Sequence, residues 1–171
     1  MKFVKFAAAS ALMLMLAGCA DTIHKPVALT ALSADRLATI HISKVTADAE
    51  KGLKVTQDDL NPVCAKVRSY IIQGSPGVFV DGASGDALVL KMHFTRFDHG
   101  SAIARFILIG LGQIHIDADV TLEQPDGTVV AKYKVKKTFA WGGMIGGTTS
   151  FEDVEEGFAK SVAEVVKTPA A

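Results

Sequence analysis

Alternation of apolar and polar residues dominates the middle of the chain. Between Ile114 and Leu122 every second residue is apolar and every residue between them is polar. This period of two is typical of a strand that buries one face and leaves the other in water. The pattern recurs, with more exceptions, in three other stretches, and a short apolar run adds a fifth candidate. The predicted strands are 36–45, 78–80, 86–98, 112–124 and 128–140.

Two longer stretches, 55–72 and 150–167, repeat their apolar residues every three or four positions. This spacing predicts helices with one buried face. Ser150, with an acid three residues later, is a candidate N-cap for the second helix. The first helix has two alternative starts. It begins either after Thr56, which also precedes an acid by three residues, or after Asn61, which precedes a proline suited to a first turn.

The turn between the last two strands decides which residues face each other. A three-residue loop, Pro125–Gly127, would place lysines of one strand on the apolar face of the other. A four-residue loop, Pro125–Thr128, keeps apolar residues opposite apolar ones and leaves the proline, which has no N–H, outside the ladder. We therefore expect the four-residue loop. Its register pairs Asp119 with Lys134 and Asp117 with Lys136.

One sheet with an apolar face and two helices with apolar faces predict a two-layer architecture. We expect an α+β sandwich, mainly an antiparallel sheet of four to five strands, with two helices packed on one face. The elements follow in the order β-α-β-β-β-β-α. The domain is expected to span 36–167, after a flexible tether at 19–35 and before a C-terminal tail at 168–171.

The start of the chain has an apolar run of another kind. Residues 6–18 form a stretch of thirteen uncharged residues, all apolar except Ser10, with two lysines ahead of it. A bilayer-spanning helix needs about 20 apolar residues, so this run is short and has the composition of a secretory signal. Residues 16–19, Leu-Ala-Gly-Cys, resemble the lipobox of bacterial lipoproteins. The resemblance implies that 1–18 is a signal peptide and that Cys19 carries the lipid.

The same resemblance has consequences for location. Stable anchoring takes at least two lipid chains, and the resemblance implies two or three acyl chains, of the palmitate type, on Cys19. In enteric lipoproteins, Asp directly after the lipidated Cys retains the protein in the inner membrane. Here that position is Ala20, and Asp21 follows it. We therefore expect the periplasmic face of the outer membrane.

Charge and cysteine content narrow the function classes. The chain has 18 Lys and Arg residues and 18 Asp and Glu residues. Removal of residues 1–18 takes away two lysines and no acid, so 16 basic residues face 18 acids. Nucleic-acid binding usually needs a basic excess, so no nucleic-acid partner is expected. Cys64 is the one cysteine besides Cys19, and we expect it to be a small buried side chain.

Two segments, 97–112 and 141–147, do not follow the sandwich pattern. The first carries Asp-x-Gly-Ser, then an arginine, then Gly-x-Gly leading into a strand. This motif resembles a family of bacterial envelope lipoproteins with a domain of unknown function, DUF4410. The resemblance covers 36–167, most firmly 86–166, and implies fold and location but no reaction. The motif residues are Asp98, Gly100, Ser101, Arg105, Gly110 and Gly112.

The apolar residues of these two segments have two alternative roles. Either 97–112 is a crossover that packs Ile107 and Leu108 into the core, or it exposes an apolar lip. Exposed apolar patches usually mark interaction sites, so such a lip would contact a partner protein or the membrane. The candidate contact residues are Phe106, Ile107, Leu108 and Ile109 in the first segment and Trp141, Met144 and Ile145 in the second.

No catalytic motif is present in the sequence, and no cofactor is expected. His41, His93 and His115 lie in predicted strands and would bind Zn²⁺ only if the strand order brought them together. The lysines opposite Asp117 and Asp119 favour a salt-bridged face over acid–base chemistry. We expect a non-enzymatic binding or assembly module with an envelope protein as partner. The alternatives are an envelope metal-binding protein or hydrolase using the His/Asp face, and a purely structural lipoprotein.

Overall fold

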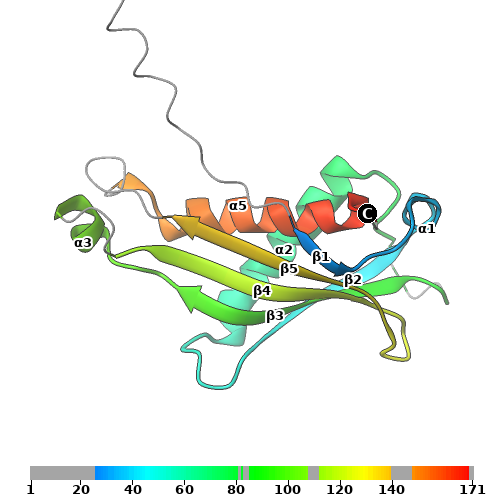
Figure 1. The fold of residues 1–171 in the computed structure, drawn as a ribbon, viewed down its shortest axis with the longest axis horizontal. Coiled ribbons are helices and arrows are strands. Elements are labelled where there is room, and N and C mark those ends of the chain that lie inside the picture. Colours follow the sequence, from blue (N-terminus) through cyan, green and yellow to red (C-terminus); the bar gives the residue numbers. More distant parts are fainter. Residues whose placement is uncertain (1–25, 81, 83–84, 108–111, 140–147, 170–171) are drawn as a thin grey trace, which may run out of the picture.

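The computed structural model describes residues 26–80, 82, 85–107, 112–139 and 148–169. These residues form one five-stranded sheet with two long helices across one face and a short helix at each end (Figure 1). The strands are β1 (Val27–Thr30), β2 (Ile42–Ala49), β3 (Leu88–Asp98), β4 (Ile114–Glu123) and β5 (Val129–Phe139). The helices are α1 (Ala34–Ala38), α2 (Gln57–Gly74), α3 (Ala102–Ile107) and α5 (Phe151–Ala163), which continues into the 3₁₀ turn η1 (Glu164–Lys167).

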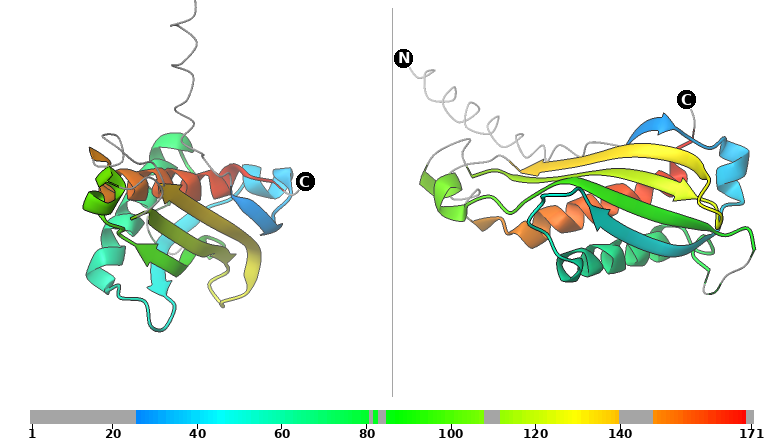
Figure 2. Two further views of the ribbon diagram at one scale, coloured as in Figure 1. Left: turned by 60° about the vertical axis from the view of Figure 1, so that its left-hand side comes forward. Right: turned by 90° about the horizontal axis from the view of Figure 1, so that it is seen from below.

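The strands lie in the order β1-β5-β4-β3-β2. Neighbours are antiparallel except β2 and β3, which are parallel and are joined through α2. A parallel pair needs such a crossover, because the chain must return to the end of the sheet from which it started. Both α2 and α5 lie on the same side of the sheet (Figure 2). The predicted two-layer α+β sandwich with a mainly antiparallel sheet is confirmed.

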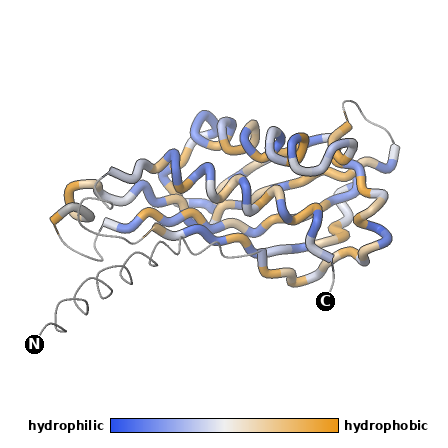
Figure 3. Tube along the Cα trace, turned by 90° about the horizontal axis from the view of Figure 1, so that it is seen from above, coloured by the Kyte–Doolittle hydropathy of each residue, from blue (hydrophilic) through white to orange (hydrophobic). Residues whose placement is uncertain are grey.

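The core lies between the apolar face of the sheet and the inner faces of the two helices. Along β4, the alternating residues from Ile114 to Leu122 are buried and the residues between them are half-buried. Figure 3 shows this alternation as changes between orange and blue along the strands. Cys64 is half-buried, and burial raises the pKa of its thiol. The core residues of the helices include Leu60, Val63, Val67 and Ile71 of α2 and Val154, Phe158 and Val162 of α5.

Both long helices begin with a capping box. Asp59 Oδ2 accepts a hydrogen bond from Thr56 N over 2.8 Å, and Asp153 Oδ2 accepts one from Ser150 N over 2.9 Å. These backbone hydrogen bonds lower the pKa of both carboxyl groups, because they stabilise the charged form. Helix α2 therefore starts after Thr56, and the alternative start at Asn61 is wrong. No helix in the described part of the chain is long and apolar enough to cross a membrane.

The N-terminal part of the domain differs from the expectation. The segment 19–35, expected to be a tether, contributes in its described part strand β1 and the start of α1. The strand predicted at 36–45 begins only at Ile42, because α1 runs to Ala38 and residues 39–41 connect it to the strand. The strand predicted at 78–80 is reduced to one bridge between Ile42 and Phe79. All four residues of β1 are exposed, so its sequence has no buried face that alternation could reveal.

The hairpin between β4 and β5 has the three-residue loop, so the expected four-residue loop is wrong. Gln124 N donates to Thr128 O over 2.8 Å, and Gly127 has a φ of 87°, which favours glycine. A register shift next to Leu122 then takes up one residue of β5, as a β-bulge does. Beyond the bulge the ladder has the predicted register. It pairs Asp119 with Lys134 and Asp117 with Lys136.

Candidate functional site

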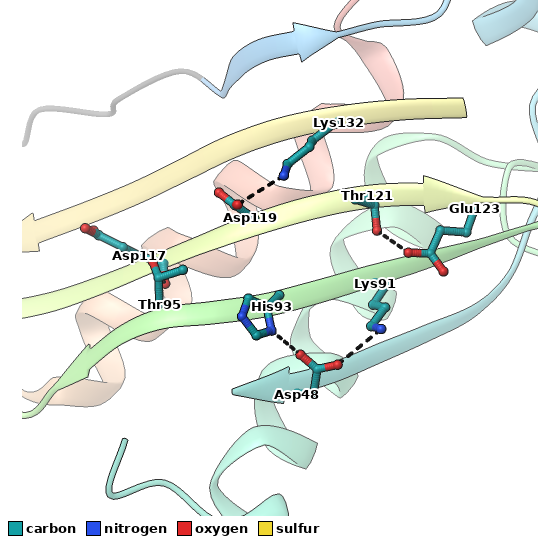
Figure 4. A network of polar contacts seen from close by, with 9 residues as sticks. All are labelled: Asp48, Lys91, His93, Thr95, Asp117, Asp119, Thr121, Glu123 and Lys132. Atoms are coloured by element: carbon teal, nitrogen blue, oxygen red, sulfur yellow. Dashed lines mark hydrogen bonds and ion pairs between the residues drawn. The ribbon is translucent and has the colours of Figure 1, made fainter. Parts of the chain in front are cut away.

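The sheet face away from α2 and α5 carries ion pairs between neighbouring strands (Figure 4). Asp119 of β4 lies between two lysines of β5, with Oδ2 3.3 Å from Lys132 Nζ and Oδ1 3.9 Å from Lys134 Nζ. Asp117 Oδ2 lies 3.9 Å from Lys136 Nζ. Cross-strand pairs of this kind each contribute about 0.2–1 kcal/mol to strand pairing. The two aspartates therefore have a structural role in the ladder.

Two histidines of this face also have partners on neighbouring strands. His93 Nδ1 lies 2.5 Å from Asp48 Oδ1, and Lys91 Nζ lies 3.2 Å from Asp48 Oδ2, which ties β3 to the edge strand β2 (Figure 4). Partial burial would raise the pKa of Asp48, but the hydrogen bonds from His93 and Lys91 outweigh it and lower that pKa. His115 Nδ1 lies 3.1 Å from Thr138 Oγ1 on β5, and burial and a nearby arginine lower the pKa of His115.

The three candidate metal ligands are spread along the sheet. His41 O accepts a hydrogen bond from Leu88 N at the start of β3. His93 lies five residues further along β3, and His115 lies opposite Asp98, a further five residues on. Five strand residues span about 16 Å, so these histidines do not converge. Within the described ranges, no three His, Cys, Asp or Glu side chains form a group that could hold a metal ion.

The motif around Ser101 builds the turn into helix α3 at one end of the sheet. Ser101 N donates to Gly112 O over 3.1 Å, and Ser101 Oγ accepts a hydrogen bond from Ala104 N over 3.3 Å. Gly100 and Gly112 have φ values of 63° and 69°, a conformation that most side chains avoid. The serine and glycines of the motif therefore have a structural role: Ser101 and Gly112 are hydrogen-bonded to each other, and Ser101 caps α3.

The other motif residues are only partly described. Asp98 ends β3, and its carboxylate accepts a 2.7 Å hydrogen bond from Arg96 Nε, which forms an ion pair at that end of the strand. Gly110 and the side chain of Arg105 lie outside the described residues. Their roles in the motif stay predictions.

Helix α3 exposes apolar side chains. Ile103 is 73% exposed and Ile107 is 66% exposed. The alternative that packs Ile107 into the core is therefore wrong. Ile103 was not predicted, although its spacing of four from Ile107 places both on one helix face. The remaining candidates lie outside the described residues: Leu108, Ile109, Trp141, Met144, Ile145 and the side chain of Phe106.

An aromatic cluster fixes the start of α5 against the same end of the sheet. The Phe151 ring stacks on His99 with 3.9 Å between centroids and meets Phe97 edge-on at 5.0 Å. Phe94 continues the cluster at 5.4 Å from Phe97 and 5.4 Å from Phe158. Aromatic contacts of this geometry add to the stabilisation from burial. These ring contacts thus pack the start of α5 against the end of β3.

Residues 76–143 match the family described as Domain of unknown function (DUF4410). The match confirms the resemblance seen in the sequence. It contains β3, α3, β4 and β5, and with them the motif from Asp98 to Gly112. Comparison with curated proteins finds no match. The DUF4410 match therefore identifies the central part of the sheet and the α3 turn, and gives no reaction.

Two solved PelC structures share the fold. The PelC dodecamer from Paraburkholderia phytofirmans, in space group P6, matches with a TM-score of 0.53 at 11% identity, over 85% of this chain and 99% of that chain. A PelC variant in space group C2 gives 0.52, also at 11% identity, over 85% and 97%. A lipoprotein candidate from Caulobacter crescentus CB15 matches at 16% identity over 74% and 93%, with a TM-score of 0.38. At these identities the PelC likeness shows the fold alone.

Proposed function

We propose that this chain is a lipid-anchored protein of the bacterial cell envelope, held on the periplasmic face of the outer membrane by acyl chains on Cys19. There it acts as a non-catalytic binding or assembly module for an envelope protein. The lipobox at residues 16–19 and the DUF4410 match support the location. The paired aspartates and the separated histidines favour this function over the metal-binding or hydrolytic alternative.

The exposed isoleucines of α3 are the observation that carries the proposal. Ile103 and Ile107 share one helix face at 73% and 66% exposure. Covering both would contribute roughly 2–4 kcal/mol, because full burial of an isoleucine is worth about 1.5–3 kcal/mol. Exposed apolar side chains gathered on one face usually mark an interaction site. The ion pair of Arg96 and Asp98 lies at the end of β3, four residues before α3 begins in the sequence.

The position of β1 allows α3 to meet a partner close to the membrane. The eight residue steps from Cys19 to Val27 span at most about 28 Å. Val27 pairs with Lys134, five residues and about 16 Å from Phe139 at the α3 end of β5. Because β1 runs antiparallel to β5, Val27 is the residue of β1 nearer to α3. The lipid anchor can therefore reach the α3 end of the domain, and equally the opposite end, because Lys134 is the middle residue of β5.

Photocrosslinking in cells tests the proposal. A photoreactive residue replaces Ile103 or, separately, Ile107 in the lipidated full chain, and captured species are identified by mass spectrometry. Val129, which is 50% exposed at the opposite end of the sheet, is the matched control position. One dominant protein adduct from both isoleucines and none from Val129 is expected.

The identity of the adduct separates the outcomes. PelC is a dodecamer, so an adduct of twice the chain mass would make the partner a second copy and the module self-assembling. Another envelope protein would be named directly. Adducts to lipid alone would contradict a protein partner and make α3 a membrane contact. No adduct from either isoleucine, with the chain correctly lipidated, would overturn the proposal.

A further inference from the structure

A groove of about 680 Å³ opens at the end of the sheet opposite α3. Three segments far apart in the sequence line it: α1 with the residues around it, the approach to β3, and the turn between β4 and β5. A volume of this size is typical of sites for small ligands. The groove lies outside the polar ladder and at the other end of the sheet from the exposed isoleucines.

Backbone and core contacts hold the walls of the groove in place. Leu37 and Ile40 anchor α1 and the turn after it in the core, at 9% and 6% exposure. In the hairpin turn, Asp126 Oδ1 accepts a 2.9 Å hydrogen bond from Thr128 N, which tightens the turn. Between two further lining residues, Leu88 N donates to His41 O over 2.8 Å. The groove is therefore formed before any ligand arrives.

Four polar side chains in the groove have no hydrogen-bond or ion-pair partner in the part of the chain that the structure describes. These residues supply one guanidinium, one carboxylate, one imidazole and one carboxamide. Polar side chains on the sheet face behave differently, since Asp48 and Asp119 are each shared between two partners. The four are Arg36, Asp86, His41 and Gln124.

The combination of these groups selects a class of ligand. A guanidinium pairs with a carboxylate or a phosphate through two parallel hydrogen bonds. The carboxylates of Asp86 and Asp126 in the same lining favour the ligand group with less negative charge, the carboxylate. A carboxylate such as that of Asp86 pairs with an ammonium group, and a carboxamide such as that of Gln124 matches both N–H and C=O of a peptide bond. Among the described residues, the lining includes no Phe, Tyr or Trp, and its one ring is that of His41, so it offers little stacking surface for a base. The apolar contacts come from small surfaces such as Pro125 and Leu32.

We propose that this groove binds a short zwitterionic peptide, with the peptide carboxylate on Arg36 and its amino group on Asp86. The side chain of Gln124 engages a peptide bond between them. This site does not depend on α3 or on a protein partner.

Isothermal titration with tri-alanine tests the proposal on the full chain in detergent micelles. Saturable binding is expected, and blocking either end of the probe, by N-acetylation or C-amidation, should weaken it about tenfold or more, since each block removes one charge-assisted contact. Arg36→Gln should weaken binding of free tri-alanine by a similar factor but leave binding of the C-amidated probe unchanged. Asp86→Asn should show the same selectivity toward the N-acetylated probe.

A second arginine, far from the groove, provides the control. Arg96→Gln removes an exposed arginine at the other end of β3 and should leave tri-alanine binding unchanged. Arg36 and Asp86 are both exposed, and thermal unfolding checks that their variants are folded. Absence of binding at millimolar tri-alanine would overturn the proposal. So would equal binding of free and blocked probes, or binding of a neutral trisaccharide in place of the peptide.

Discussion

Gly157 lies inside α5, where alanine would usually stabilise a helix by about 1 kcal/mol. In this protein we expect that gain to be lost, because α5 crosses a buried lysine of β5. A methyl group at Gly157 would meet Lys137 Cε at 2.8 Å and Nζ at 3.2 Å. Lys137 is only 3% exposed, so its side chain has little room to move away. Overpacking costs about 1–3 kcal/mol, which offsets or exceeds the helix gain.

A double-mutant cycle with Lys137→Ala isolates this contact. The three atoms nearest to the added methyl group all belong to Lys137. Gly157→Ala should therefore be stabilising once the lysine is truncated. We expect a coupling free energy of about 1–3 kcal/mol, measured by urea unfolding of the four proteins followed by circular dichroism.

The control for this cycle is Gly85→Ala. A methyl group at Gly85 would meet no atom within 4 Å, and the residue does not have a positive φ. Its effect should add to that of Lys137→Ala within about 0.5 kcal/mol. The same additivity between Gly157→Ala and Lys137→Ala would refute the packing argument.

Three further predictions concern the cap, the polar face and α3. Ser150→Ala removes the α5 cap and should cost about 1 kcal/mol in urea unfolding; an unchanged midpoint would contradict the capping box. Hydrogen bonds lower the pKa of Asp48 in the folded protein despite partial burial. The contribution of Asp48 to the free energy of unfolding is therefore present above the unfolded pKa of about 3.9 and is lost as the pH falls through the folded pKa. Asp48→Asn should therefore make unfolding less dependent on pH below about 4, and an unaltered acid titration would argue against the contact. Ile107→Ser should leave the free energy of unfolding within about 0.5 kcal/mol, because the side chain is exposed, and should abolish crosslinking from position 103; a persistent adduct would count against the α3 interface.

Strands β3, β4 and β5 could be predicted because each buries one face and exposes the other. The alternation of apolar and polar residues follows directly from that difference between the faces. The same alternation correctly predicted the pairing of Asp119 with Lys134. Strand β1 could not be predicted, since an edge strand with all residues exposed carries no such pattern. The predicted length of the hairpin loop was wrong for a different reason. A bulge next to Leu122 compensates for the shorter loop. A three-residue loop with a bulge and a four-residue loop without one therefore give the same apolar pattern.

The candidate site was only partly predictable, because its components depend on strand order. The separation of the three histidines follows from the parallel position of β2 beside β3 and from the register of β4 on β3, which the sequence does not state. The contact between Asp48 and His93 has the same origin. The exposure of Ile107 was one of two open alternatives, since an apolar residue in a short helix can face either way. The groove joins three distant segments, so no local motif marks it.

The two proposed sites lie at opposite ends of one rigid sheet and should act independently. Strand β4 has ten residues between them and spans about 30 Å. The groove lies at the end of the sheet away from α3, because the turn between β4 and β5 lines it. Ile107→Ser should therefore leave tri-alanine binding unchanged, and Arg36→Gln should leave crosslinking from position 103 unchanged. Loss of both activities in either variant, with normal unfolding, would show that the ends are coupled through the sheet and would contradict this division.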